Sequence, residues 1–255
     1  MSHFHGKFLW YELMTTDVAA AKSFYSTVVG WTTKDMSMPG MDYTIFQVGE
    51  AGVAGLMTLP KDAGSMPAWV GYIGADDVDV YAAKVAAAGG SVHKAPADIP
   101  TVGRFAVVTD PHGAFFILFK PSMEMPSVPP PAPGTPGTAG WHELMAGDGA
   151  ADFDFYSSLF GWTKGPGHDM GPMGIYQIFE IDGKQSGGIM TKPPVMPAAF
   201  WGYYFIVNGI DAATERIKSA GGQVANGPMQ VPGGQWIVQG IDLQGAYFNL
   251  LSNTK

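Results

Sequence analysis

The sequence of 255 residues predicts an α+β protein, in which four βαβββ modules form two curled eight-stranded sheet barrels with the helices outside. Two observations lead to this class. The chain contains one pattern twice, since FLWYELMTTDVAAAKSFYSTVVGW beginning at Phe8 returns as GWHELMAGDGAADFDFYSSLFGW beginning at Gly140. Within each copy, the order of one strand, one helix and three strands also occurs twice. Such an order gives a small sheet with its helix on one face.

The first module opens with a strand predicted over residues 8–14. A helix follows, which Thr16 or Asp17 can cap and which Gly30 ends. Three short strands come next, at 31–36, 42–48 and 52–59. The buried face of the helix is predicted from apolar residues at helical spacing, which are Ala21, Phe24, Tyr25 and Val28.

The second module repeats this order. A strand begins at Trp69, a helix begins at Asp77 and ends at Gly89, and strands follow at 91–94, 104–109 and 114–119. The second copy has the same plan, and its helices end at Gly161 and Gly221. We therefore predict a first domain over 7–120 and a second over 140–255, each containing two modules.

Residues 121–139, PSMEMPSVPPPAPGTPGTA, separate the two copies. Proline has no backbone donor and its ring restricts φ, so this segment cannot form a helix or an interior strand. It is predicted to be a semi-rigid, extended linker.

Composition excludes several classes of function. The absence of cysteine excludes disulfides, thiolate catalysis and cysteine-bound zinc. With a net charge of −8 and only two arginines, the surface would repel nucleic acid. No apolar run approaches the roughly 18 residues of a membrane span, and no signal peptide is visible, so a cytoplasmic protein is expected. The predicted partner is a small molecule, and neither a nucleic acid nor a membrane is expected.

Three repeated motifs resemble the vicinal oxygen chelate superfamily, which includes glyoxalase I, bleomycin-resistance proteins and extradiol dioxygenases. The resemblance covers nearly everything outside the linker, and the tandem layout is most similar to two-barrel bacterial proteins labelled glyoxalase-like or hydroxylase-like. In the first copy the motifs are D-x-x-x-A-x-x-FY-x-x-x-x-GW from Asp17, GADDVDV from Gly74 and DPHGAFFIL from Asp110. Their counterparts begin at Asp148, at Ile206 as IVNGID and at Asp242 as DLQGAYFNL.

The resemblance implies a divalent metal held by His, Gln or Glu at four inward strand positions. By register from Asp17 and Asp148, these positions fall on or near Trp10, Gly55, Val70 and Ile117, and on or near Trp141, Gly188, Gly202 and Asn249. None of these side chains is a good ligand for a transition metal. No metal and no other cofactor is therefore predicted, and a divalent metal at other positions stays open.

One carboxylate recurs in both copies. Glu12 and Glu143 are equivalent, and each shares a strand face with a tryptophan and a methionine. An inward carboxylate in an apolar hollow must be hydrogen-bonded, paired or protonated. Three roles stay open: a structural carboxylate, a ligand-binding group, or a general base, which makes these two residues the candidate catalytic residues.

The other candidate site residues lie on strands that are expected to face the cavities. Three roles stay open for Arg104: an ion pair with Glu12, binding of an anionic group of the ligand, or a position at the surface or the rim of the barrel. Aromatic rings at these positions could stack on a planar ligand, and core packing is the competing interpretation. The candidate ligand-binding residues are Trp10, Met14, Tyr43, Tyr72, Arg104, Trp141, Met145, Tyr176, Tyr203 and Asn249. His3 and His5 are predicted to lie in a mobile tail.

The favoured function is that of a glyoxalase/bleomycin-resistance-like protein that binds a small apolar or aromatic molecule in a barrel cavity. One alternative is a metal-dependent glyoxalase-type lyase, dioxygenase or hydroxylase. The second alternative is a non-catalytic interaction module. A monomer or a homodimer is expected, because tandem copies can satisfy within one chain the pairing that related barrels make between chains.

Overall fold

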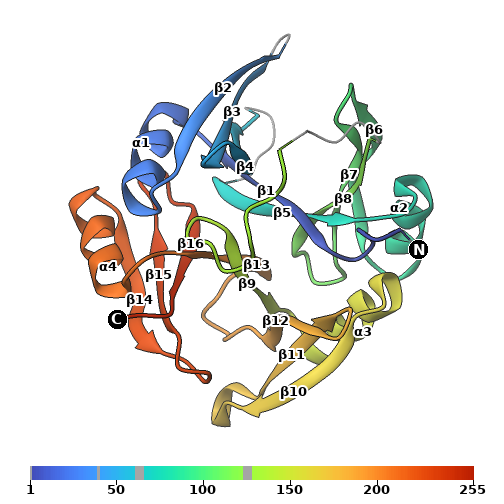
Figure 1. The fold of residues 1–255 in the computed structure, drawn as a ribbon. Helices are drawn as coiled ribbons and strands as arrows, with labels where there is room; N and C mark the ends of the chain where they lie inside the picture. The colour runs from blue at the N-terminus through green and yellow to red at the C-terminus, as the bar shows by residue number, and fades with distance from the viewer. Residues whose placement is uncertain (1, 39–40, 61–65, 123–127) are drawn as a thin grey trace. The chain divides into compact units, whose positions relative to one another are not determined.

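The computed structural model describes residues 2–38, 41–60, 66–122 and 128–255, and the order strand, helix and three strands occurs four times along it (Figure 1). The first module consists of β1 Phe8–Thr15, α1 Val18–Val28, β2 Thr32–Met38, β3 Met41–Val48 and β4 Ala51–Thr58. The second consists of β5 Ala68–Gly74, α2 Val78–Ala87, β6 Ser91–Ile99, β7 Gly103–Thr109 and β8 Phe115–Pro121.

The second copy of the sequence supplies the third and fourth modules. The third consists of β9 Ala139–Ala146, α3 Gly149–Phe160, β10 Thr163–Asp169, the 3-10 turn η1 Gly171–Met173, β11 Ile175–Ile181 and β12 Lys184–Thr191. The fourth consists of β13 Phe200–Ile206, α4 Ile210–Ser219, β14 Gln223–Gln230, β15 Trp236–Ile241 and β16 Tyr247–Ser252.

The strands fall into two eight-stranded sheets, in the orders β2-β3-β4-β1-β5-β8-β7-β6 and β10-β11-β12-β9-β13-β16-β15-β14. In the first module, β1 runs parallel to β4, while β2, β3 and β4 form an antiparallel meander. The predicted α+β class and module order are confirmed. Each sheet has two end strands, so the sheets are open and not closed barrels. Among the described residues, no helix has both the length and the apolar character needed to cross a membrane.

Local sequence explains where the helices begin and which face they bury. α1 begins after Asp17, whose carboxylate accepts a hydrogen bond from the amide of Ala20 at 2.9 Å, and Asp148 caps α3 in the same way. α3 ends at Gly161, whose φ of 71° is the left-handed conformation that glycine adopts without strain. The predicted inward face of α1 is confirmed, because its buried residues are Ala21, Phe24, Tyr25 and Val28.

The chain divides into two compact units. Unit 1 contains residues 1–9, 70–127 and 142–201, and unit 2 contains residues 10–69, 128–141 and 202–255. Unit 1 thus combines the second and third modules, and α2 contacts α3 within it; unit 2 combines the first and fourth modules, and α1 contacts α4 (Figure 1). Each unit therefore contains parts of both predicted domains, 7–120 and 140–255. Those two domains correspond to the two copies of the sequence repeat.

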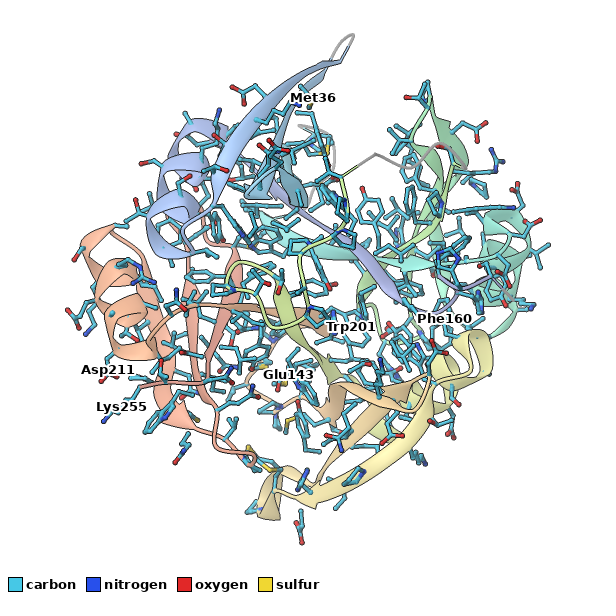
Figure 2. The ribbon with its side chains drawn as sticks, viewed as in Figure 1. Met36, Glu143, Phe160, Trp201, Asp211 and Lys255 are labelled. Atoms are coloured by element: carbon cyan, nitrogen blue, oxygen red, sulfur yellow. The ribbon has the colours of Figure 1, made fainter. Side chains whose placement is uncertain are left out.

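The same chain of three hydrogen-bonded side chains lies in the core of each unit. In unit 2, Trp69 Nε1 donates to the Tyr25 hydroxyl at 2.9 Å, and this hydroxyl donates to Asp242 Oδ2 at 3.0 Å. The equivalent residues in unit 1 are Trp201, Tyr156 and Asp110, with distances of 2.9 and 3.2 Å (Trp201 is labelled in Figure 2). Each chain joins an aspartate from one copy of the sequence to a tyrosine and a tryptophan from the other copy, so it ties the two copies together.

The segments that precede β1 and β9 pack in equivalent ways. In unit 1, Trp162 Nε1 donates to the carbonyl oxygen of Gly6 at 2.8 Å. In unit 2, Trp31 Nε1 donates to the carbonyl oxygen of Gly137, also at 2.8 Å. Residues 128–138 contain neither helix nor strand, and residues 123–127 lie outside the described residues. Of the predicted linker 121–139, Pro121 lies in β8 and Ala139 lies in β9. The end of the predicted linker is therefore a fixed part of unit 2.

The prediction of a mobile N-terminal tail is wrong for His5. Its side chain is buried, and its Nε2 lies 3.1 Å from the Tyr81 hydroxyl of α2. The backbone amide of Asp76 donates to its Nδ1 at 3.4 Å. Sequence alone did not reveal this, because both partners come from the second module.

Candidate functional site

Trp10, Tyr43 and Glu12 form a hydrogen-bonded group on one face of the first module. Trp10 Nε1 donates to the Tyr43 hydroxyl at 3.0 Å, and this hydroxyl donates to Glu12 Oε2, also at 3.0 Å. Glu12 is only 6% exposed. Burial and the charge of Glu12 raise the pKa of Tyr43 above its ordinary value, so the phenol stays protonated and continues to donate. Glu12 is therefore a buried carboxylate that accepts a hydrogen bond from a neutral tyrosine.

Glycine is required beneath this group. Gly55 on β4 pairs with Glu12 on β1, and a Cβ atom at residue 55 would collide with the Tyr43 hydroxyl. The second copy repeats the arrangement, since Gly188 pairs with Glu143 and a Cβ atom at residue 188 would collide with the Tyr176 ring. Gly55 and Gly188, at or near which the resemblance implies a metal ligand, are thus places where a tyrosine covers bare backbone. A metal-binding side chain has no room there.

We expect Gly55→Ala to lower the free energy of unfolding by about 1–3 kcal/mol, because the new methyl group forces Tyr43 out of its place. Urea denaturation monitored by circular dichroism measures this loss. Gly167→Ala is the control, because the nearest atom to a Cβ at this strand position is 3.3 Å away on the Ile175 side chain. Equal losses in the two variants would contradict the packing argument.

The centre of the corresponding face in the fourth module is polar. Asn249 on β16 pairs with Tyr204 on β13 and with Gln239 on β15. Gln239 Nε2 donates to the Tyr204 hydroxyl at 2.8 Å, and Gln239 Oε1 accepts from Asn226 Nδ2 at 3.0 Å. Asn249 is 0% exposed, and neither atom of its amide has a hydrogen-bond partner among the described residues. A buried amide without partners costs about 1–3 kcal/mol, so it needs an explanation.

An apolar rim surrounds this polar centre. Tyr204, Ile206, Ile237 and Leu251 form one buried cluster, and Trp141 packs against it. A hollow of about 250 Å³ adjoins the cluster and shares Ile206 and Leu251 with it. Asn249 lies two residues before Leu251 on β16 and is not one of the residues that line this hollow.

The second module has no such centre. Tyr72 pairs with Ile117, and Ile117 pairs with Val107, so isoleucine and valine stand where the fourth module has asparagine and glutamine. Tyr72 packs edge-on against Phe119. The unpartnered amide is thus a property of one copy and was not duplicated.

Two of the predicted ligand-binding residues lie elsewhere. Tyr203 was expected on the inner face, but it packs edge-on against Tyr11, and its neighbour Tyr204 pairs with Asn249 instead. The prediction was one residue out of register, and adjacent strand residues point to opposite faces. Arg104 binds Asp79 through two nitrogens at 2.7 and 2.9 Å and binds Asp98 at 2.9 Å, so its pairing with Glu12 is wrong.

Met14 and Met145 occupy equivalent positions on β1 and β9. Met14 is half-buried beyond Glu12 on β1, and Met145 is buried beyond Glu143 on β9 (Glu143 is labelled in Figure 2). Sequence reasoning missed Gln239 and Asn226. The register of β15 against β16 could have identified Gln239, because it is the direct neighbour of Asn249.

His142 is a partly buried residue of unit 1. Its ring stacks on Phe8 with centroids 4.0 Å apart, and its Nδ1 donates to the carbonyl oxygen of Ser186 at 2.6 Å. Burial lowers the pKa of His142 to about 4, and the Ser186 hydrogen bond opposes this only partly. The imidazole is therefore neutral at physiological pH.

This lowered pKa gives a testable pH dependence. The stabilisation from neutral His142 is complete above the unfolded pKa of about 6.5 and is lost as the pH falls towards the folded value of about 4. We expect the wild-type protein to lose on the order of 2 kcal/mol relative to His142→Gln between about pH 7.5 and pH 4.5, a figure reduced for the partial exposure of the side chain. Urea denaturation of both proteins at each pH measures this. A difference that does not change with pH would contradict the assignment.

The comparisons with known proteins agree with this architecture. The model of the Glyoxalase/Bleomycin resistance protein/Dioxygenase superfamily matches residues 7–118. A Mycobacterium tuberculosis protein named "Putative glyoxylase CFP32" is 32% identical over 247 residues, which cover 95% of this chain and 93% of that protein. The chain belongs to this superfamily. The anthracycline biosynthesis protein DnrV of Streptomyces peucetius is 33% identical over 263 residues, covering 95% of this chain and 91% of that protein.

Solved structures of the superfamily share the fold. The 2,2',3-trihydroxybiphenyl 1,2-dioxygenase of Sphingomonas wittichii aligns with a TM-score of 0.69 and 13% identity, covering 98% of this chain and 91% of that one. The Mn(II)-bound glyoxalase of Novosphingobium aromaticivorans aligns with a TM-score of 0.63 and 17% identity, covering 99% and 83%. At these identities the likeness concerns the fold alone.

The donor set of this chain does not fit the divalent metal that the resemblance implies. The residues at or near the family's positions are Trp10, Gly55, Val70, Ile117, Trp141, Gly188, Gly202 and Asn249. Within the part of the chain that the structure describes, no three His, Cys, Asp or Glu residues come together in a way that could hold a metal ion. Glycine at residue 55 cannot be exchanged for a ligand without displacing Tyr43.

Proposed function

We propose that this superfamily member binds a small aromatic molecule on the inner face of the fourth module, where Asn249 hydrogen-bonds the polar groups of that molecule. The unpartnered amide of Asn249 carries the proposal. A bound molecule with an acceptor for Nδ2 and a donor for Oδ1 would recover the free energy that the buried amide costs in its absence. The apolar rim of Trp141, Ile237 and Leu251 would hold the rest of the molecule.

Hydroxylated aromatic ketones and quinones match this chemistry. Their flat rings suit an apolar face with aromatic side chains, and adjacent carbonyl and hydroxyl groups supply one acceptor and one donor. Two Streptomyces relatives are named for anthracycline biosynthesis, and anthracyclines are fused-ring quinones of this kind. A net charge of −8 favours a neutral or weakly cationic molecule over an anionic one.

We further propose that binding requires no metal. The reason is the donor set, since Asn249 is the only residue with a side-chain oxygen or nitrogen acceptor among the eight residues at or near which the resemblance implies a metal ligand. An amide oxygen is a weak ligand for a transition metal, and it is a good partner for a hydroxyl group.

Isothermal titration calorimetry with alizarin, a dihydroxyanthraquinone, tests both proposals. Alizarin is expected to bind the untagged protein at one site before and after dialysis against EDTA, and anthraquinone, which lacks the hydroxyl groups, is expected to bind more weakly. Equal binding of the two compounds would refute the role of the amide. Stoichiometric iron, zinc, nickel or manganese in the protein, together with loss of binding after dialysis, would refute the metal-free proposal.

Proton transfer by Glu12 or Glu143 stays a prediction. The Tyr43 donor supports a structural role for Glu12, because it supplies the hydrogen bond that a buried carboxylate needs. Glu12→Gln is expected to lower thermal stability. Loss of turnover of an identified substrate at unchanged stability would instead assign Glu12 as a base.

A further inference from the structure

A histidine and an aspartate join the second and third modules within unit 1, whereas Asn249 of the proposed binding face belongs to unit 2. His112 lies on the turn between β7 and β8, and Asp152 lies in the first turn of α3. His112 Nδ1 donates to Asp152 Oδ1 at 2.7 Å, and the Gly147 amide donates to Asp152 Oδ2 at 3.2 Å. The Asp152 side chain is completely buried, whereas that of His112 is 35% exposed. A buried carboxylate thus holds an imidazole that solvent can protonate.

The imidazole is also packed against backbone. A Cβ atom at Gly147 would collide with the Cβ and ring of His112, so glycine at this position makes room for the ring. The two modules therefore meet here through a titratable pair of side chains, with His112 from the first copy of the sequence and Asp152 from the second.

The equivalent joint of unit 2 lacks this pair. Counting from the capping residues Asp17 and Asp148, Ala21 stands where Asp152 stands, and Gln244 of DLQG stands where His112 stands in DPHG. The buried aspartates of the two motifs bind alike, since Asp110 Oδ1 accepts from the amide of residue 112 at 3.0 Å and Asp242 Oδ1 accepts from that of residue 244 at 2.9 Å. The histidine and the second carboxylate are therefore additions to a shared framework.

All the charged groups that act on His112 are acidic. Asp110 lies on its own turn, and Asp148 and Asp152 come from the start of α3. The hydrogen bond to Asp152 is the main reason that the pKa of His112 lies above its ordinary value, and desolvation opposes it. Burial and the charge of Asp152 raise the pKa of Asp110 to about 6, and burial raises that of Asp152. A protonated His112 thus offsets two buried carboxylates.

We propose that the joint between the second and third modules is pH-sensitive, and that it loosens when His112 loses its proton. The neutral imidazole still donates from Nδ1, but the charge that balances Asp110 and Asp152 is gone. The turn at residues 110–114 is then held less firmly against α3. Unit 2 has no such response at the equivalent joint, because glutamine and alanine do not titrate.

The sign of the effect follows from the raised pKa of His112. The stabilisation is complete below the unfolded pKa of about 6.5 and is lost as the pH rises through the folded value. If the pKa of His112 is one pH unit higher in the folded state than in the unfolded state, the equilibrium constant for opening increases about tenfold as the pH rises through both values. Asp110 and Asp152 act in the same direction, since their raised pKa values favour the protonated forms in the folded state. His142 titrates at lower pH and does not obscure this range.

The double variant His112→Gln/Asp152→Ala gives unit 1 the glutamine and the alanine that unit 2 has at the equivalent positions. His168→Gln in unit 1 is the control. Amide exchange of residues 110–114, corrected for intrinsic rates, is measured between about pH 6.5 and pH 9. In the wild-type protein and in the control, the protection of these amides against exchange is expected to fall at least several-fold as the pH rises. In the double variant, protection is expected to stay constant. An equal loss in the double variant would overturn the proposal. If the double variant does not fold, Asp152→Asn is used, and the pKa of His112 is measured by NMR titration. A pKa of His112 that is no lower in Asp152→Asn than in the wild-type protein would also overturn the proposal.

Discussion

Replacing Asn249 with leucine is expected to make the protein more stable and to weaken alizarin binding at least tenfold. The substitution removes an amide that is buried without a hydrogen-bond partner among the described residues, so the free energy of unfolding should rise by about 1–3 kcal/mol. It also removes the only groups at this position that can recognise a hydroxyl or a carbonyl. Urea denaturation measures the first effect and calorimetric titration the second.

Opposite changes in stability and affinity distinguish a binding residue from a structural one. Ile117→Leu is the matched control, because residue 117 occupies the same register position in the second module. This variant is expected to change the affinity for alizarin little and to lower stability by less than about 1.5 kcal/mol. If Asn249→Leu lowers stability and leaves affinity unchanged, the amide is structural and the proposed site is wrong.

Replacing Asp242 with alanine is expected to lower the free energy of unfolding by about 3–5 kcal/mol, which is a large fraction of the stability of a typical domain. Its Oδ1 accepts from the amides of Gln244 and Ala246 at 2.9 and 2.8 Å, and its Oδ2 accepts from the Tyr25 hydroxyl. Alanine leaves all three buried donors without their acceptor. Urea denaturation at neutral pH measures the loss.

Two variants separate the contributions of the backbone and the tyrosine. Asp242→Asn keeps an oxygen for the two backbone amides, so it should cost about 1–2 kcal/mol. Tyr25→Phe removes the hydroxyl that both Trp69 and Asp242 bind, and a similar loss is expected. A loss from Asp242→Ala as small as that from Tyr25→Phe would show that the turn retains its hydrogen bonds through other groups.

Much of the secondary structure could be predicted from local sequence. The spacing of Ala21, Phe24 and Val28 predicted the buried face of α1, and Asp17 and Gly161 marked helix ends. These features depend on neighbours a few residues apart, so a single sequence contains them. The β6 strand was predicted to end at Lys94, but it continues to Ile99, because its later residues pair with β7 across register shifts that no local pattern reveals.

The candidate site was predictable only in part. The shared face of Trp10 and Glu12 follows from the alternation of side chains along a strand. The role of Gly55 became clear only when Tyr43, on another strand, was seen to cover it. For the same reason the sequence does not distinguish Tyr203 from Tyr204, because neither residue can be assigned to a face until β13 is paired with β16.

The sequence by itself determined four modules, their order, and the family to which they belong, because a duplicated pattern of helix faces, caps and turns is local information. Only the tertiary structure decided how modules combine. The aspartates of DPHG and DLQG each bind a tyrosine from the other copy of the sequence, through Tyr156 with Asp110 and Tyr25 with Asp242. The repeat makes pairing within one copy and pairing between copies equally compatible with the local pattern. Long-range packing and buried hydrogen bonds select between them. These interactions join residues that are far apart in the sequence, as Tyr25 and Asp242 are.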